Sequence, residues 1–108
     1  MLYHFEQFLL DTGKSELLKD GHPVAIEPRV FALLAFLIEH RERLLSKDEI
    51  LEKVWDGRFV SDSALASSIK AARKAVGDDG QSQRFIKTVH GKGFRFRADV
   101  RVEREPSA

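Results

Sequence analysis

The sequence predicts an α+β domain in which a small N-terminal antiparallel sheet is followed by three helices and a C-terminal β-hairpin. Three observations lead to this order. An Asp-Gly pair separates two short apolar runs near the N-terminus, three segments with helical apolar spacing follow, and two strand-like runs flank a glycine-rich stretch near residue 90. A chain of 108 residues is long enough to bury one core, so we expect a single domain over residues 1–98 and a charged linker or tail over residues 99–108.

Short apolar runs predict the strands of the N-terminal sheet. Leu17-Leu18 and residues 24–26 flank Asp20-Gly21. An Asp-Gly pair favours a two-residue hairpin turn because both residues tolerate a positive φ. Pro23 has no backbone N–H to donate, which predicts that it lies on an edge strand or at a strand start.

Two helices are predicted next. Pro28 suits a first helical position, where its missing N–H leaves no helical hydrogen bond unmade. The apolar residues after it cover most sides of a helix, which predicts burial; they are Val30, Phe31, Leu33, Leu34, Phe36, Leu37 and Ile38. Residues 46–49 have the pattern of a capping box, in which the Ser46 oxygen accepts from the backbone of Glu49, and they predict a short second helix that ends at Trp55.

The third helix is expected to begin after a cap at Ser61 or Asp62 and to run to Val76, with Gly77 as its C-terminal stop. One apolar stripe along it predicts the buried face: Leu65, Ile69, Ala72 and Val76. A second stripe on another face contains Ser63, Ser67, Lys70 and Lys74. Strand-like runs at residues 85–89 and 94–98 surround His90-Gly91-Lys92-Gly93, which predicts a hairpin with a basic tip whose glycines permit close approach of a partner.

Several classes of function have no support in the sequence. The chain has no cysteine, its four histidines lack metal-ligand spacing, and no catalytic constellation is visible. Asp78-Asp79 is explained as a solvated turn. The longest apolar run, Val30–Ile38, is too short to span a bilayer. We therefore expect no enzyme, metal, cofactor, small-molecule substrate or membrane contact, and a cytoplasmic location.

The charge is unevenly distributed although the net charge is only +1. Residues 1–27 hold two lysines against five acidic residues, whereas residues 61–98 hold eight lysines and arginines against three aspartates. A basic C-terminal half is typical of nucleic-acid binding and also of an ordinary solvated face, so charge alone decides neither.

The ordered set of motifs resembles the OmpR/PhoB-type winged-helix DNA-binding domain, which also stands at the N-terminus of CadC- and ToxR-like regulators. The resemblance covers residues 3–98. It rests on Glu27-Pro28, Phe31, Leu33-Leu34, residues 45–51, Val54-Trp55, residues 60–62, Ile69-Lys70, residues 73–78 and residues 86–96. It implies a winged helix-turn-helix with a four-stranded N-terminal sheet, a recognition helix over residues 61–76 in the major groove of DNA, and a wing over residues 85–98 at the minor groove or backbone.

The resemblance also implies roles for individual residues. Base-facing positions fall on Ser63, Ala64, Ser67, Ser68 and Ala71; phosphate-facing positions fall on Lys70 and Arg73, with Lys74 near the backbone. The wing contributes His90, Lys92 and Arg95. Asp56, Gly57, Arg58 and Phe59 match a loop that contacts RNA polymerase in some relatives, and relatives bind direct repeats as head-to-tail pairs.

Two departures from the family pattern bear on specificity. The base-facing positions hold serine and alanine, which offer hydroxyl and methyl contacts but no bidentate reading of guanine. His90 replaces an arginine of the wing and is charged only when protonated. The expected function is the DNA-binding module of a bacterial transcriptional regulator on the nucleoid. The alternative is a winged-helix module for protein–protein interaction with weak or no DNA binding.

Overall fold

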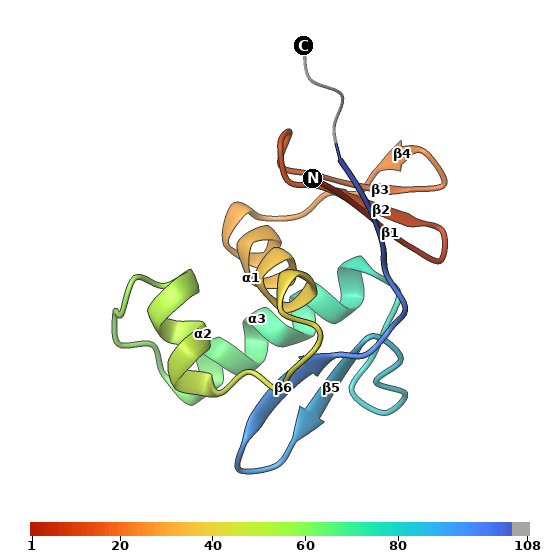
Figure 1. Ribbon diagram of the computed structural model, residues 1–108. Coiled ribbons are helices and arrows are strands. Elements are labelled where there is room, and N and C mark those ends of the chain that lie inside the picture. Colours follow the sequence, from red (N-terminus) through yellow and green to blue (C-terminus); the bar gives the residue numbers. More distant parts are fainter. Residues whose placement is uncertain (105–108) are drawn as a thin grey trace.

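The N-terminal strands form an antiparallel sheet at one end of the molecule (Figure 1). The computed structural model describes residues 1–104. The first four strands are β1 (Leu2–Phe5), β2 (Phe8–Asp11), β3 (Glu16–Lys19) and β4 (His22–Pro23). Asp20 and Gly21 have φ values of 51° and 80°, which confirms the predicted turn, and Pro23 lies on the edge strand β4.

The C-terminal part of the chain returns to this sheet. Residues Arg101–Glu103 form β7, which pairs antiparallel with β1 and makes a fifth strand in the order β4-β3-β2-β1-β7. This differs from the tail expected from residue 99. Alternating charges are common on exposed edge strands, so composition alone did not reveal the pairing. Residues 105–108 of the expected tail lie outside the described residues.

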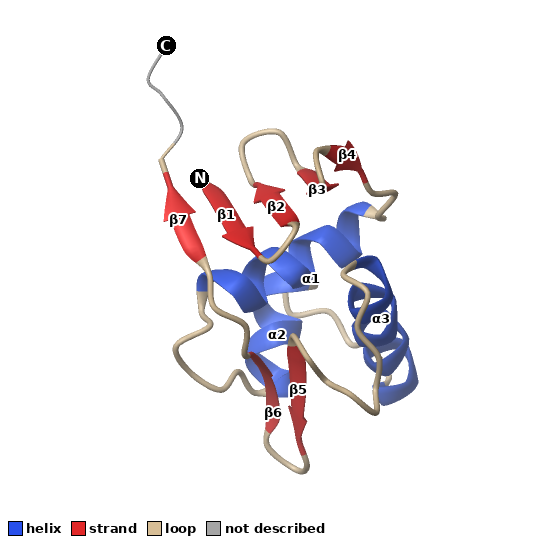
Figure 2. Ribbon diagram, turned by 90° about the vertical axis from the view of Figure 1, so that its right-hand side faces the viewer, coloured by secondary structure: helices blue, strands red, loops and turns tan. Residues whose placement is uncertain are grey.

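Three helices lie between this sheet and the second hairpin (Figure 2). They are α1 (Pro28–Glu39), α2 (Lys47–Val54) and α3 (Asp62–Ala75). α1 has Pro28 in its first turn and is buried on most sides, as predicted. The Ser46 hydroxyl accepts from the backbone N–H of Glu49 at 3.1 Å, and Ser61, rather than Asp62, caps α3 by accepting from Ala64 N–H at 3.1 Å.

The second hairpin consists of β5 (Ile86–Val89) and β6 (Gly93–Phe96). Four aromatic rings join its base to the N-terminal sheet. Phe5 lies 5.4 Å from Phe8, 5.7 Å from Phe85 and 5.3 Å from Phe96 between ring centroids. Because these rings are almost fully buried, the base of the hairpin is part of the core and its tip projects from a fixed support.

Candidate nucleic-acid interface

Helix α3 has one buried face and one exposed face. Leu65, Ile69, Ala72 and Val76 are each at most 2% exposed and pack into the core, which confirms the predicted inward stripe. The exposed residues on the rest of the helix include Ser63, Ala64, Ser67, Lys70 and Lys74, whereas Ser68 and Ala71 are half-buried. We call Ser63, Ala64, Ser67 and Lys70 the exposed face of α3.

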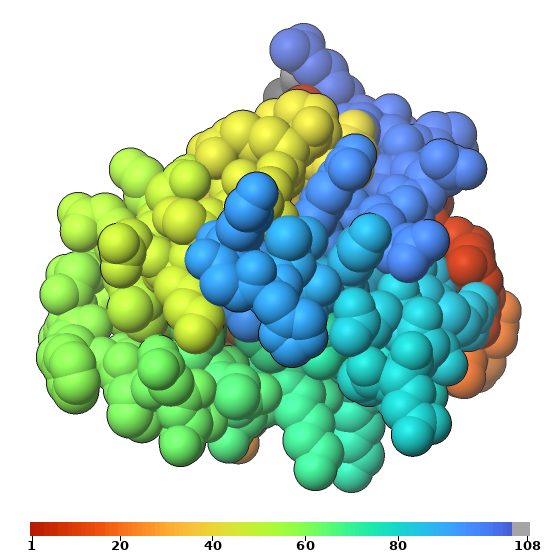
Figure 3. All heavy atoms as spheres, turned by 90° about the horizontal axis from the view of Figure 1, so that it is seen from below, coloured from red at the N-terminus to blue at the C-terminus, as the bar shows by residue number. Residues whose placement is uncertain are grey.

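The hairpin formed by β5 and β6, which we call the wing, lies beside α3. In the view from below, the blue atoms of the wing adjoin the green atoms of α3 on one face of the molecule (Figure 3). His90, Gly91 and Lys92 form the wing tip and are exposed. The predicted α3 and wing-tip residues are therefore brought together on a single surface.

Gly93 fixes the wing to the rest of the molecule by a close backbone contact. Its φ is 153°, and a Cβ at this position would lie 1.9 Å from the carbonyl oxygen of Leu45. The next residue, Phe94, exchanges two backbone hydrogen bonds with Leu45, each 2.9 Å long. The close approach that the glycines were predicted to permit is thus made at Gly93 by the same chain, while Gly91 lies in the open turn.

Arg73 connects α3 to the wing. Its Nε and Nη2 donate to the carbonyl oxygen of Ile86 at 3.2 and 3.0 Å, and Nη2 also donates to Thr88 Oγ1 at 2.7 Å. Desolvation lowers the pKa of this guanidinium, against the opposing effects of Asp78 and Asp79. The side chain holds the wing at a set position on α3, a role that its place in the helix pattern did not reveal.

Asp78 organises the loop between α3 and the wing. Its two carboxylate oxygens accept from the backbone N–H groups of Asp79, Arg84, Phe85 and Ile86 at 2.7 to 3.1 Å. Burial alone would raise the pKa of the carboxyl, but these backbone bonds together lower it. The prediction of a solvated turn is wrong for Asp78, which is 8% exposed. Its place directly after the helix-ending Gly77 is the sequence signal for a carboxylate that binds loop backbone.

The loop between α2 and α3 exposes an aromatic side chain. Phe59 is 95% exposed, the largest exposure among the large hydrophobic residues described. Asp56 and Gly57 have φ values of 54° and 74°, which turn the chain sharply after Trp55 and lead it outward to Arg58. The Phe59 ring is therefore not part of the hydrophobic core.

Within residues 1–104, no three histidine, cysteine, aspartate or glutamate side chains form a metal-binding group. Within the same residues, no helix has the length and apolar character needed to cross a bilayer.

Comparisons with known proteins agree on one family. The model of the family described as "Transcriptional regulatory protein, C terminal" matches residues 21–96. The chain is 33% identical over 103 residues to the transcriptional regulator HilA of Salmonella typhi, covering 95% of this chain and 18% of HilA. It is 33% identical over 89 residues to the phosphate regulon regulatory protein PhoB of Pseudomonas aeruginosa, covering 82% of this chain and 38% of PhoB.

A solved structure agrees with the sequence comparisons. The DNA-binding domain of Klebsiella pneumoniae RstA, crystallised in complex with the RstA box, superposes with a TM-score of 0.78 at 25% identity, covering 88% of this chain and 95% of that domain. The chain therefore spans nearly all of a solved DNA-binding domain but only 18% and 38% of the two curated relatives.

Proposed function

The chain belongs to the OmpR/PhoB-type family of DNA-binding domains of transcriptional regulators, and we propose that it binds duplex DNA with α3 in the major groove and the wing tip at the adjacent minor groove. The observation that carries the proposal is the shared surface of the exposed face of α3 and the wing tip, each backed by buried residues (Figure 3). A helix fits the major groove, and a basic loop beside it reaches the neighbouring groove or phosphates. Binding of this kind makes no chemical change to DNA.

Phosphate attraction and base reading fall to different side chains in this proposal. Lys70, Lys74 and Lys92 are exposed and make no ion pair or side-chain hydrogen bond within residues 1–104, so their charges are available to phosphates. Ser63, Ala64 and Ser67 face outward and supply hydroxyl and methyl contacts to base edges, with Ser68 and Ala71 at the margin. Each bidentate base pair contact that is missing removes about 1–3 kcal/mol of discrimination, so we expect shape to contribute much of the specificity.

In this proposal Arg73, which is half-buried, mainly positions the wing. Its guanidinium is already committed to Ile86 and Thr88, so a substitution there would disturb the wing as well as any phosphate contact. Arg95 lies on β6, outside the wing tip, and is exposed.

The whole protein is proposed to act in transcription on the bacterial chromosome, because HilA and PhoB are transcriptional regulators. The exposed Phe59, with Asp56, Gly57 and Arg58, supports the proposal that the α2–α3 loop contacts RNA polymerase. A head-to-tail pair on direct repeats is proposed from the family resemblance.

The proposal is tested by fluorescence anisotropy with a random-sequence duplex across about 50 to 200 mM salt. The variant Lys70→Gln/Lys74→Gln should flatten the log–log salt slope by about 1.8, because each lost phosphate contact removes about 0.9. Arg73 is left intact in this variant so that the wing stays in place. Lys14→Gln/Lys19→Gln, which removes the same charge from the β2–β3 turn and from strand β3, should keep the parent slope.

Two outcomes would overturn the proposal. One is the absence of binding at the lowest salt. The other is equal flattening by the α3 variant and by the Lys14/Lys19 variant, which would mean that net charge rather than a docked helix sets the affinity. Either outcome would favour a protein-interaction module, for which the exposed Phe59 is the first surface to test.

A further inference from the structure

Arg29, in the first turn of α1, contacts the far end of α2. Its Nη1 donates a hydrogen bond to the carbonyl oxygen of Val54, the last residue of α2, although the two residues are 25 positions apart in the chain. The same guanidinium lies over the indole ring of Trp55, with Cζ 5.6 Å from the ring centroid. One side chain therefore joins the start of the first helix to the point where the chain leaves the second.

Both contacts are of a kind that stabilises the end of a helix. The carbonyl groups in the last turn of a helix have no helical donor, and a positive charge suits the negative end of the helix dipole. A charged donor makes a stronger hydrogen bond than a neutral one, and tryptophan is the aromatic ring that attracts a cation most. Trp55 is half-buried against the core, so water screens this attraction less than it would at the open surface.

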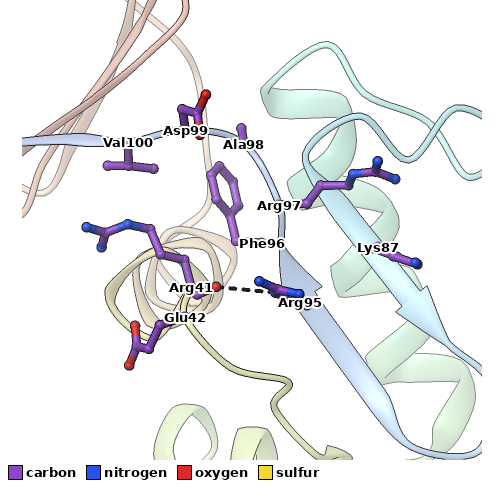
Figure 4. A pocket seen from close by; sticks show the side chains of 9 residues that line it. All are labelled: Arg41, Glu42, Lys87, Arg95, Phe96, Arg97, Ala98, Asp99 and Val100. Carbon is purple, nitrogen blue, oxygen red and sulfur yellow. Dashed lines mark hydrogen bonds between the residues drawn. The ribbon is translucent and has the colours of Figure 1, made fainter.

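A second arginine makes a weaker contact of the same type. Beyond the C-terminal end of α1, Nε of Arg95 lies 3.4 Å from the carbonyl oxygen of Arg41, beside the groove drawn in Figure 4. This bond is long and exposed, and the guanidinium groups of Arg41 and Arg97 point away from each other (Figure 4). The guanidinium of Arg29, by contrast, has both a carbonyl group and an aromatic ring as partners, which together fix its position.

Trp55 is the residue at which the α2–α3 loop begins. The backbone N–H groups of Trp55 and Gly57 both donate to the carbonyl oxygen of Leu51, at 3.0 and 3.1 Å. The N–H of Arg58 then donates to the carbonyl oxygen of Trp55 at 2.9 Å. Because these bonds tie the turn to Trp55, the position of Trp55 sets the direction in which the exposed Phe59 leaves the molecule.

Helix α3 has its own support. The four side chains of its inner face are each at most 2% exposed, and Ser61 caps its first turn. Buried apolar contacts along a helix contribute far more than one surface contact at a neighbouring loop. The exposed face of α3 and the α2–α3 loop are therefore held in place by different contacts.

We propose that Arg29 is the positioning residue of the α2–α3 loop: it holds Trp55 from α1 and so sets how Phe59 is presented to a protein partner. DNA docking by α3 does not require it. The partner contact rests on the proposed function, whereas the hold on Trp55 is measured on the domain alone. Replacement of Arg29 should therefore separate the loop from DNA binding within one folded domain.

The test uses the full chain, in which Trp55 is the only tryptophan, so its fluorescence reports on this part of the molecule. Quenching by acrylamide measures the access of solvent to the indole, and chymotrypsin cleavage after Phe59 measures opening of the loop. Arg29→Met removes the charge, so it should raise the quenching constant and speed the cleavage by about tenfold. Arg29→Lys keeps a cation near the ring, so its cleavage rate should stay within about threefold of the parent rate.

Arg84→Met is the matched control. The Arg84 guanidinium lies 5.0 Å from the Phe85 ring centroid and donates to Glu6 at 2.8 Å. This variant therefore also loses one charge, one ring contact and one polar contact, but none of them involves Trp55. It should leave quenching and cleavage at the parent values. In the anisotropy assay with the random-sequence duplex, Arg29→Met should keep the salt slope of the parent.

Three results would overturn the inference. Parent-like quenching and cleavage in Arg29→Met would show that Trp55 is held without the guanidinium. Equal changes in Arg29→Met and Arg84→Met would indicate a general loosening of the domain. A salt slope flattened by about 0.9 in Arg29→Met would make the guanidinium a phosphate contact instead. Absence of DNA binding by the parent would overturn the proposed function and leave the result for Trp55 as it stands.

Discussion

The Asp78 side chain alone accepts four of the backbone hydrogen bonds that hold the loop between α3 and β5. Four backbone N–H groups from the start of the α3–β5 loop to the first residue of β5 point at its two oxygens. A buried N–H without an acceptor is costly, so the loop depends on the ionised carboxylate and on both of its oxygens.

We predict that Asp78→Asn lowers the free energy of unfolding by about 3 kcal/mol at neutral pH, because the amide nitrogen would face the N–H groups of Phe85 and Ile86. Urea unfolding followed by circular dichroism measures the effect. Asp99→Asn is the matched control, since Asp99 is exposed, and should change the stability by less than about 0.5 kcal/mol. An equal effect of the two substitutions would contradict the assigned role.

The pH dependence of the parent protein follows from the same residue. The pKa of Asp78 in the folded state is lowered from its ordinary value of 3.8, so its stabilising contribution is fully present above that value. The contribution is lost as the pH falls through the folded-state pKa. The unfolding free energy of the parent should therefore decrease more steeply below about pH 4 than that of Asp78→Asn, and parallel curves would contradict the prediction.

At the scale of elements, local patterns predicted most of the fold, and contacts between distant residues supplied what they missed. Caps, apolar spacing and turn residues predicted the three helices and both hairpins because each signal lies within a few residues of what it specifies. Arg73, the pairing of Leu45 with Phe94 and the strand β7 each join segments 13 or more residues apart in the chain. Asp78 binds backbone N–H groups within the next eight residues, but the residue pattern does not show which way its carboxylate points. A helix pattern places Arg73 on a face of α3 but does not say which strand lies against that face.

The wing provides a prediction at this scale. Gly93→Ala should destabilise the domain by about 4 kcal/mol, because the new Cβ meets the Leu45 carbonyl and the backbone conformation is also unfavourable for alanine. Gly91→Ala is the matched control: its φ of 71° is also unfavourable, but no atom lies within 4 Å of the new Cβ, so the cost should be about 1–2 kcal/mol. Thermal unfolding of the two variants separates the cost of the close contact from the cost of backbone strain. Equal losses of stability in the two variants would contradict a role for the contact with Leu45.

On the scale of the whole molecule, the charge changes from acidic to basic along the direction from the N-terminal sheet to the wing. The N-terminal sheet, where acidic residues outnumber basic ones, lies at one end, and the basic wing lies at the other (Figure 1). A dipolar distribution of this kind orients a protein as it approaches a polyanion even when the net charge is only +1.

The pairing of β7 with β1 brings two distant segments of the chain close enough for a circular permutation. The register sets Glu103 opposite Leu2, at the end of the molecule remote from the wing tip. A short turn could link these two residues, and new ends could be opened beside the exposed Phe59. Such a circular permutant should keep the same packing of helices and strands. Its dissociation constant for the duplex in the anisotropy assay should lie within a few-fold of the parent's. A permutant that folds but loses binding would show that the α2–α3 loop must be continuous for α3 to dock.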